Sequence, residues 1–322
     1  MTMKAIRYHA YGPPDVIELQ DVGRPEAGDG DVLVRVRAAC VNPGDLHLLR
    51  GSPYILRAVS GLTRPKSPML GNDFAGEVEA VGKGVTRFRP GDEVYGCHAG
   101  AFAEYVTVPE GGPIARKPAD LTFEQAAAVP TSALTALQAL RDKARVKAGQ
   151  KVLVNGASGG IGTFAVQLAR SYGAEVTGVC GSGNAELVRS LGAGHVIDYA
   201  KEDFTRGRYD VILDNVGNRS VADCRRALTP GGTLIPNSGS GGRWVGPMGR
   251  IIRLKAMERF VGQRFPNFVT RENADDLATL AALLEDGTLR PVIDRVHPLS
   301  EVPEAMAYAE RRHAKGKVVI II

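Results

Sequence analysis

The segment from Val154 to Gly162 (VNGASGGIG) has the residue types and spacing best suited to chemistry in this chain of 322 residues. Ala157, Gly159 and Gly162 fill the three fixed positions of a GxGxxG-type pattern, with alanine in the first position. In such a loop the first position allows a tight turn, the second lets a pyrophosphate approach the backbone, and the third allows close helix packing. The N-terminus of the following helix favours an anion. The expected phosphate-binding residues are Ala157, Ser158, Gly159, Gly160 and Ile161.

The flanking residues favour a nucleotide-binding loop over a simple glycine-rich turn. Lys151–Val154 has the pattern of a buried strand, and apolar residues from Ile161 to Ala169 recur on one helical face. Glu175–Val179 is the next expected strand. A glycine motif by itself is weak evidence. A strand before it and a helix after it are the context of a dinucleotide-binding fold.

The end of the second expected strand indicates which dinucleotide is bound. Enzymes that use NAD usually carry Asp or Glu there, about 20 residues after the glycine motif, to bind the ribose 2′-hydroxyl. The corresponding segment here, Val179–Asn184 (VCGSGN), contains no acidic residue. Because a carboxylate would repel a 2′-phosphate, its absence favours NADPH. Ser182 and Asn184 could donate hydrogen bonds to that phosphate, or could be ordinary loop residues.

Two kinds of pattern divide the chain. In the first third, short strands such as the alternating Val32–Val36 are separated by glycine and proline turns, which indicates a small barrel or sandwich. After about Leu121, apolar strands alternate with helices, which is typical of a parallel, doubly wound sheet. A helix over Asn273–Glu285 and strands over Arg290–Val296 and Lys317–Ile322 are expected near the C-terminus.

The composition is that of a globular enzyme. Apolar residues make up 44% and charged residues 23% of the chain, which excludes disordered and fibrous classes. The net charge of +5 is scattered along the chain, so we expect no nucleic-acid partner. No stretch reaches the roughly 18 consecutive apolar residues of a membrane-spanning helix, so we expect no membrane span. The first residues lack an uninterrupted apolar core, so we expect a cytoplasmic protein. The cysteines form no CxxC motif and are expected to be reduced and buried: Cys40, Cys97, Cys180 and Cys224.

With these motifs the chain resembles the medium-chain dehydrogenase/reductase superfamily. More narrowly, it resembles the zinc-independent quinone oxidoreductase branch and its NAD(P)-dependent alcohol dehydrogenase-like relatives. The matching segments include VNPGD (41–45), GNDFAGEVEAVGKGVTRFRPGDEVYG (71–96), NGASGGIGTFAVQLA (155–169) and HAKGKVVI (313–320). The resemblance implies an α/β fold with a GroES-like β-barrel catalytic domain, residues 1–122 completed by 271–322. It also implies a Rossmann NADPH-binding domain with a doubly wound parallel sheet, residues 123–270, and an active site in the cleft between the domains.

The resemblance further implies a reaction without a catalytic metal. Zinc-dependent relatives carry Cys, His and Cys ligands where this sequence has Asn42, Asn72 and Thr131, and a catalytic zinc needs such ligands. Cys40 is two residues out of register with the first ligand position. Without zinc, the substrate oxygen must be polarised by hydrogen bonds. Quinones and α,β-unsaturated carbonyls tolerate this best because their acceptor carbon is already electron-poor, so they are the expected substrates.

By resemblance, Asn42 and Asp45 are the expected catalytic residues, with Asn42 near the substrate oxygen and Asp45 orienting its loop. Thr131 is expected to contact the nicotinamide or its ribose. Further cofactor contacts are expected at strand ends and around the 2′-phosphate, from Ser182, Tyr199, Asn215, Asn237, Ser238 and Arg312. Each of these residues also has an ordinary interpretation, as a turn residue, a helix cap, a packing residue or a surface charge.

Partners and alternative functions are less constrained. The segment Arg243–Arg264 combines Trp244 with basic residues and is most simply a surface helix packed on the Rossmann domain; a substrate lid or a membrane contact are alternatives. A homodimer is expected, joined through an edge strand near Gln263–Val269. Two other functions remain open: reduction of simple aldehydes or ketones, and a non-enzymatic role as an NADPH-binding sensor or RNA-binding protein.

Overall fold

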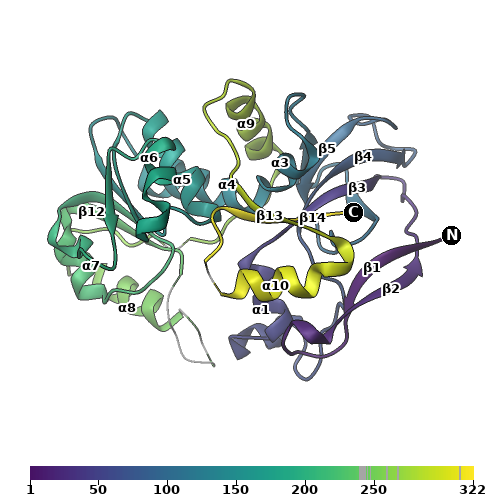
Figure 1. Ribbon diagram of the computed structural model, residues 1–322, viewed down its shortest axis with the longest axis horizontal. Coiled ribbons are helices and arrows are strands. Elements are labelled where there is room, and N and C mark those ends of the chain that lie inside the picture. The colour runs from purple at the N-terminus through teal and green to yellow at the C-terminus, as the bar shows by residue number, and fades with distance from the viewer. Residues whose placement is uncertain (239–243, 245, 247, 259, 267, 312) are drawn as a thin grey trace. The chain divides into compact units, whose positions relative to one another are not determined.

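The chain folds into two compact units (Figure 1). The computed structural model describes residues 1–322 apart from 239–243, 245, 247, 259, 267 and 312. Unit 1 consists of Met1–Leu134 together with Arg271–Ile322, and unit 2 consists of Thr135–Thr270. The two ends of the chain therefore belong to the same unit, and the middle of the chain forms the other.

Unit 2 is built on a parallel sheet whose strand order is β10-β9-β8-β11-β12. This order places β8 and β11 side by side, and the chain proceeds outward from them in opposite directions. Parallel neighbours need crossover connections, and helices α5, α6 and α7 provide three of them (Figure 1). The doubly wound sheet predicted from the alternating pattern is confirmed. The bounds are β8 Lys151–Asn155, α5 Gly160–Ser171, β9 Glu175–Cys180, α6 Ala185–Ser190, β10 His195–Asp198, β11 Tyr209–Asp214, α7 Val221–Ala227, β12 Leu228–Pro236 and α8 Met248–Glu258.

The central strands of unit 2 are buried on both faces, which explains their uninterrupted apolar sequences. Val211, Ile212 and Leu213 of β11 are each at most 1% exposed. Helix α8 joins the core on one face through Leu254, which belongs to the same apolar cluster as Phe265. Within the described residues, the segment 243–264 therefore contributes a packed surface helix, as its simplest interpretation predicted.

Unit 1 is a mostly antiparallel β-structure. Its main sheet has the order β13-β14-β3-β4-β5-β7, β6 also pairs with β3, and β1 and β2 form a separate hairpin. Strand β14 pairs with β3, so the C-terminal residues of the chain lie beside residues 38–41. The bounds are β1 Thr2–Tyr8, β2 Ile17–Gly23, β3 Asp31–Val41, β4 Asp73–Val81, β5 Glu93–Cys97, β6 Tyr105–Pro109, β7 Ile114–Arg116, β13 Ile293–Pro298 and β14 Lys317–Ile321.

Helices of unit 1 begin at residues suited to capping. Helix α3 follows Thr122, whose side chain accepts the N–H of Gln125, and α9 follows Asn273, whose side chain accepts the N–H of Asp276.

The sequence placed the first domain boundary after residue 122, whereas α3 packs on β3 and β4 and lies in unit 1. No helix among the described residues is long and apolar enough to cross a membrane. The bounds are α1 Pro43–Arg50, α2 Arg57–Ser60, α3 Phe123–Ala127, α9 Ala274–Glu285 and α10 Val302–Glu310, and α4 Pro130–Gln138 begins in unit 1 and ends in unit 2.

The edge strand expected near Gln263–Val269 does not form among the residues described there. The structure shows a single bridge in this segment, between Arg264 and Thr233 of β12. Pro266 follows closely and has no N–H to donate to a ladder, which explains why pairing does not continue. Among the described residues, β12 is consequently the last strand on this side of the sheet.

Gly162 is the point at which α5 packs on the loop that precedes it. A Cβ atom at Gly162 would lie 2.1 Å from the carbonyl oxygen of Gly156, whereas at Gly159 the nearest atom would be 3.6 Å away. We expect Gly162→Ala to lower the free energy of unfolding by about 1–3 kcal/mol, the usual range for overpacking, and Gly159→Ala to lower it much less. Urea unfolding of the two variants measures the difference, and equal losses would contradict this packing role.

Candidate active site

The loop between β8 and α5 holds the candidate phosphate-binding residues of unit 2. Its left-handed turn residue is Gly156, with φ of +80°, and not Ala157 as the sequence pattern suggested. Ala157 is buried, and its N–H donates to the carbonyl oxygen of Val179 at 3.0 Å. A Cβ atom at Gly159 would contact only the carbonyl oxygen of Gly156, at 3.6 Å, and α5 begins at Gly160. Because the first N–H groups of a helix have no partner within it, this loop is suited to an anion.

A second polar group lies where β9 and β10 end. Nδ2 of Asn184 donates to Oγ of Ser158 at 3.1 Å, which connects the phosphate loop to the turn Ser182–Asn184. Tyr199 is 54% exposed, and its hydroxyl would lie 3.4 Å from a Cβ atom at Gly181. The structure thus brings Ser158, Ser182 and Tyr199 to the same edge of the sheet. Arg312, the remaining candidate for the 2′-phosphate, lies outside the described residues.

At the ends of β11 and β12 the structure brings Asn215 and Asn237 together. Nδ2 of Asn237 donates to Oδ1 of Asn215 at 2.9 Å. Nδ2 of Asn215 is buried and has no hydrogen-bond partner among the described residues. Ser238 follows Asn237, and its carbonyl oxygen accepts a hydrogen bond from Arg250 at 3.0 Å. Since an unpaired buried donor is costly, Nδ2 of Asn215 is suited to a ligand oxygen.

A buried carboxylate, Asp214, organises these strand ends. Its Oδ1 accepts hydrogen bonds from Asn155 Nδ2 and from the N–H of Gly217, both at 2.8 Å. Its Oδ2 accepts a hydrogen bond from Arg250 at 2.6 Å, and the side chains of this ion pair are 0% and 10% exposed. A buried pair is stable when further hydrogen bonds satisfy it, as they do here. Arg250 therefore attaches α8 to the end of β11.

In unit 1, Asn42 and Asp45 lie at the start of α1. The carboxylate of Asp45 accepts the N–H of Asn42 at 2.8 Å and the N–H of Gly71 at 3.2 Å, so it connects two loops. Burial raises the pKa of Asp45 to about 7, because the charged form loses its hydration. Oδ1 of Asn42 accepts a hydrogen bond from Nζ of Lys317 at 2.5 Å.

Lys317 also connects this region to the start of α4. Its Nζ donates to Oγ of Ser132 at 3.0 Å and lies 3.8 Å from Oδ2 of Asp73. Asp73 in turn accepts the N–H of Thr131 at 3.2 Å and the hydroxyl of Thr131. Burial opposes the charge of Lys317, but interactions with Cys40 and with the nearby carboxylates raise its pKa overall. The ammonium thus stays charged inside the protein.

Comparison with known proteins agrees with this arrangement. Residues 28–119 match a family model described as the alcohol dehydrogenase GroES-like domain, and residues 191–320 match one described as zinc-binding dehydrogenase. A quinone oxidoreductase of Sus scrofa is 33% identical over 99% of this chain and 98% of its own length. The chain belongs to the medium-chain dehydrogenase/reductase superfamily.

Two further similarities place this superfamily member among reductases. An Arabidopsis thaliana protein named NADPH-dependent alkenal/one oxidoreductase, chloroplastic, is 34% identical over 99% of this chain and 79% of its own length. The solved structure of the quinone oxidoreductase from Coxiella burnetii has a TM-score of 0.88 at 32% identity and covers 100% of both chains. The protein is an NAD(P)H-dependent oxidoreductase with a GroES-like domain and a Rossmann-like domain.

The three positions that hold zinc ligands in some members of the superfamily are occupied here by amides and a hydroxyl. Asn72 donates to Oγ1 of Thr131 at 3.3 Å, and Asn42 is bonded to Lys317. Among the described residues, no three His, Cys, Asp or Glu side chains are grouped so that they could hold a metal ion. The cysteines are buried and free, as predicted, and burial raises the pKa of Cys40 to about 12.

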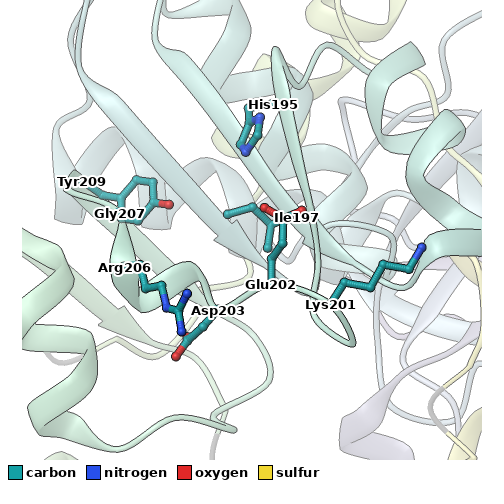
Figure 2. A pocket seen from close by; sticks show the side chains of 8 residues that line it. All are labelled: His195, Ile197, Lys201, Glu202, Asp203, Arg206, Gly207 and Tyr209. Atoms are coloured by element: carbon teal, nitrogen blue, oxygen red, sulfur yellow. The ribbon is translucent and has the colours of Figure 1, made fainter.

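A hollow of about 340 Å³ elsewhere in unit 2 is lined by none of the candidate residues. It lies beside β10, the loop that follows it and the first residue of β11 (Figure 2). Figure 2 shows the side chain of Lys201 extending away from the other lining side chains. Charged residues of both signs line the hollow, and Asp203 pairs with Arg219 at 3.4 Å. We assign this hollow no role in the reaction.

Sequence reasoning missed the residues that hold the candidates in place. Lys317 donates hydrogen bonds to both Asn42 and Ser132. The ion pair of Arg250 with Asp214 fixes the strand ends beside Asn215 and Asn237. Lys317 could have been noticed as a charged residue beginning the apolar strand KVVII, and Asp214 as an acid ending the strand YDVILD. Arg250 gave no comparable signal, because it is one of several basic residues in its segment.

The raised pKa of Asp45 predicts a particular pH dependence of stability. The folded protein holds a proton on Asp45 up to about pH 7, whereas the unfolded chain releases it near the ordinary pKa of 3.8. Between those values the folded state binds more protons, so the free energy of unfolding falls as the pH rises. We expect wild type to lose stability relative to Asp45→Asn across this window, measured by urea unfolding at several pH values. Parallel pH profiles for the two proteins would show that Asp45 has an ordinary pKa.

Proposed function

We propose that this protein transfers a hydride from NADPH to quinones or α,β-unsaturated carbonyls without a catalytic metal. The observation that carries the proposal is the environment of Asn42, which stands where zinc-dependent relatives have a cysteine ligand and is bonded to a buried lysine. An amide N–H can donate a hydrogen bond to a substrate oxygen. A single donor polarises a carbonyl less than a metal ion does. This arrangement suits acceptors whose carbon is already electron-poor.

The residues of unit 2 fit a dinucleotide. The small residue Gly159 and the first N–H groups of α5 suit a pyrophosphate, with Ser158 and Ile161 beside it. The unpaired Nδ2 of Asn215 suits the carboxamide oxygen of a nicotinamide. Asn237 and Ser238 support this end of the site from the next strand. When bound, NADPH would supply the hydride, and the chain itself would supply position and hydrogen bonds.

We infer NADPH rather than NADH from the turn after β9. Ser182 and Asn184 lie there beside Tyr199, and the turn offers hydroxyl and amide groups but no carboxylate. Asp198 ends the neighbouring strand, but its Oδ1 accepts the N–H of Ala200 at 3.1 Å and its Oδ2 lies 3.7 Å from Nζ of Lys201. These contacts partly compensate its charge. Arg312 remains a further candidate for the phosphate by resemblance.

In unit 1 we assign Asn42 as the donor to the substrate oxygen and Asp45 as the residue that holds its loop. Thr131 donates its hydroxyl hydrogen to Asp73 and accepts a hydrogen bond from Asn72, so its side chain is fixed. By resemblance we place Thr131 beside the nicotinamide or its ribose. The proton that completes reduction comes from solvent, so the acceptor gains a hydride and a proton in total.

The alternatives predict different behaviour in the same assay. A reductase of simple aldehydes or ketones would need stronger polarisation of an unactivated carbonyl than one amide provides. A sensor or RNA-binding protein would bind NADPH without turnover, and RNA binding would weaken steeply with salt.

We also propose a homodimer and a cytoplasmic location. Support for the dimer is the place of β12 as the last strand of the described sheet, since the last strand of a sheet can pair with another chain.

The assay is NADPH oxidation, followed by absorbance, with a quinone, an enone and a simple aldehyde, and with NADH in parallel. We expect turnover of the quinone or the enone with NADPH, and little with the aldehyde or with NADH. Ser182→Asp should lower kcat/KM for NADPH by about tenfold or more, because a carboxylate would face the 2′-phosphate. Ser190→Asp is the matched control, since it adds the same charge on the exposed surface of α6.

Tight NADPH binding without turnover of any acceptor would remove the reductase proposal and favour the sensor. Equal effects of Ser182→Asp and Ser190→Asp would instead contradict the location given to the 2′-phosphate.

A further inference from the structure

Lysine is an unfavourable residue at the position that begins β14. The following residues Val318, Val319 and Ile320 are buried apolar residues, and the side chain of Lys317 is itself only 3% exposed. Burying an ammonium costs several kcal/mol unless its partners compensate for the lost hydration. An apolar side chain would extend the core at no such cost. The presence of Lys317 is therefore explained by what its ammonium contacts and not by packing.

The contacts of Lys317 fix the orientation of the Asn42 amide. Nζ lies 2.5 Å from Oδ1 of Asn42, 3.0 Å from Oγ of Ser132 and 3.8 Å from Oδ2 of Asp73, and it also interacts with the thiol of Cys40. An ammonium has hydrogens to donate and no lone pair, so it can bond only to the oxygen end of the amide. The NH2 end of Asn42 must therefore point away from Lys317.

The NH2 group of Asn42 retains donor capacity. An asparagine before a helix usually accepts an N–H of the first turn with its own side chain. At α1 the N–H of Asp45 donates to the backbone carbonyl oxygen of Asn42 at 3.0 Å, and Oδ1 of Asn42 accepts a hydrogen bond from Lys317. Within the described part of the chain, Nδ2 has one acceptor, the carbonyl oxygen of Cys40, at a long distance of 3.4 Å. At least one N–H of this amide is available for a ligand oxygen.

We propose that Lys317 is a positioning residue for the reduction, which orients the Asn42 amide toward the substrate oxygen and strengthens it as a donor. This inference rests on the proposed function, since it concerns the same oxygen. A charged donor on the amide oxygen polarises the amide, and consecutive hydrogen bonds reinforce one another. The benefit grows as negative charge develops on the substrate oxygen, so it acts on the transition state more than on the ground state.

The kinetic test is a double-mutant cycle between Lys317 and Asn42. We expect Lys317→Met and Asn42→Ala each to lower kcat by about 10²-fold, the order found when one oxyanion donor is removed, with KM changed less than about threefold. The double variant should be no slower than the slower single variant, because Lys317 acts through Asn42. Lys317→Gln should recover part of kcat, since it keeps a donor to Oδ1 but removes the charge, and it also serves if Lys317→Met does not fold.

Lys117→Met is the matched control. Lys117 is also a lysine of unit 1 with a side chain 3% exposed, and its Nζ donates to the carbonyl oxygens of Pro118 and Leu121 and pairs with Glu93 at 3.0 Å. We expect this variant to lose stability but to keep kcat. Multiplicative losses in the double variant, or a Lys317→Met protein that is only less stable, would overturn the positioning role.

A measurement that needs no turnover separates this inference from the proposed function. The side-chain amide of Asn42 can be observed by 15N NMR and identified by its disappearance in Asn42→Ala. We expect its resonance to shift in Lys317→Met and to stay in place in Lys117→Met. If wild type turns over no acceptor while this result is obtained, the reductase proposal fails and the orientation by Lys317 stands. An unchanged resonance in Lys317→Met overturns the orientation itself.

Discussion

A buried ammonium must be compensated by its surroundings, and in unit 1 this requirement determines where the polar side chains lie. Lys317 enters on β14, which pairs with β3 so that Val318 faces Val41. That register places the ammonium beside Asn42, the residue after β3. Ser132 and Asp73 approach from α4 and β4, so segments distant in sequence meet at one charge. Removing one partner of such a buried pair typically lowers the free energy of unfolding by about 3–5 kcal/mol. The positions of these side chains therefore depend on one another.

Unit 2 arranges its polar groups through strand order. Because β8 and β11 are neighbours at the point where the order reverses, their carboxyl ends lie side by side, and ligands bind there in doubly wound sheets. Asn155 ends β8 and donates to Asp214, which ends β11. Arg250 from α8 satisfies the other oxygen of the same carboxylate. Asn155 and Arg250 thus both donate to the Asp214 carboxylate, and Nδ2 of the neighbouring Asn215 has no partner among the described residues and is left for a ligand.

Much of this architecture was predictable from local patterns. Strand and helix periodicity revealed the doubly wound sheet, and glycine spacing revealed the β8–α5 loop, since both depend on residues close in sequence. The turn residue was misplaced by one position: Gly156 has the left-handed backbone, and the pattern alone did not distinguish it from Ala157. The expected edge strand required Pro266 to lie on a side that makes no pairing, whereas the structure shows a single bridge at Arg264 and no further pairing among the described residues there.

The supporting residues were not predictable, because their roles depend on pairs far apart in sequence. Lys317 contacts Asn42 across 275 positions, and Arg250 contacts Asp214 across 36. A basic residue in a charged segment, or a lysine beginning a strand, has many interpretations until its partner is known. Sequence identified the residues suited to touch a ligand, whereas the residues that orient them required the sheet registers.

The protonation of Asp45 bears on the chemistry proposed for Asn42. The carboxyl groups of Asp45 and Asp73 both lie near Lys317, so an ionised Asp45 would add negative charge close to Asn42. Burial raises the pKa of Asp45 to about 7, so near neutral pH a large fraction of Asp45 is protonated and adds no charge there. An oxyanion that develops near Asn42 would then accept a hydrogen bond from an amide that is polarised by Lys317. It would not be repelled by a negative charge on Asp45. The burial of Asp45 therefore has two effects. It lowers the stability of the protein when Asp45 is ionised, and it keeps Asp45 neutral near pH 7, which favours negative charge on a substrate oxygen.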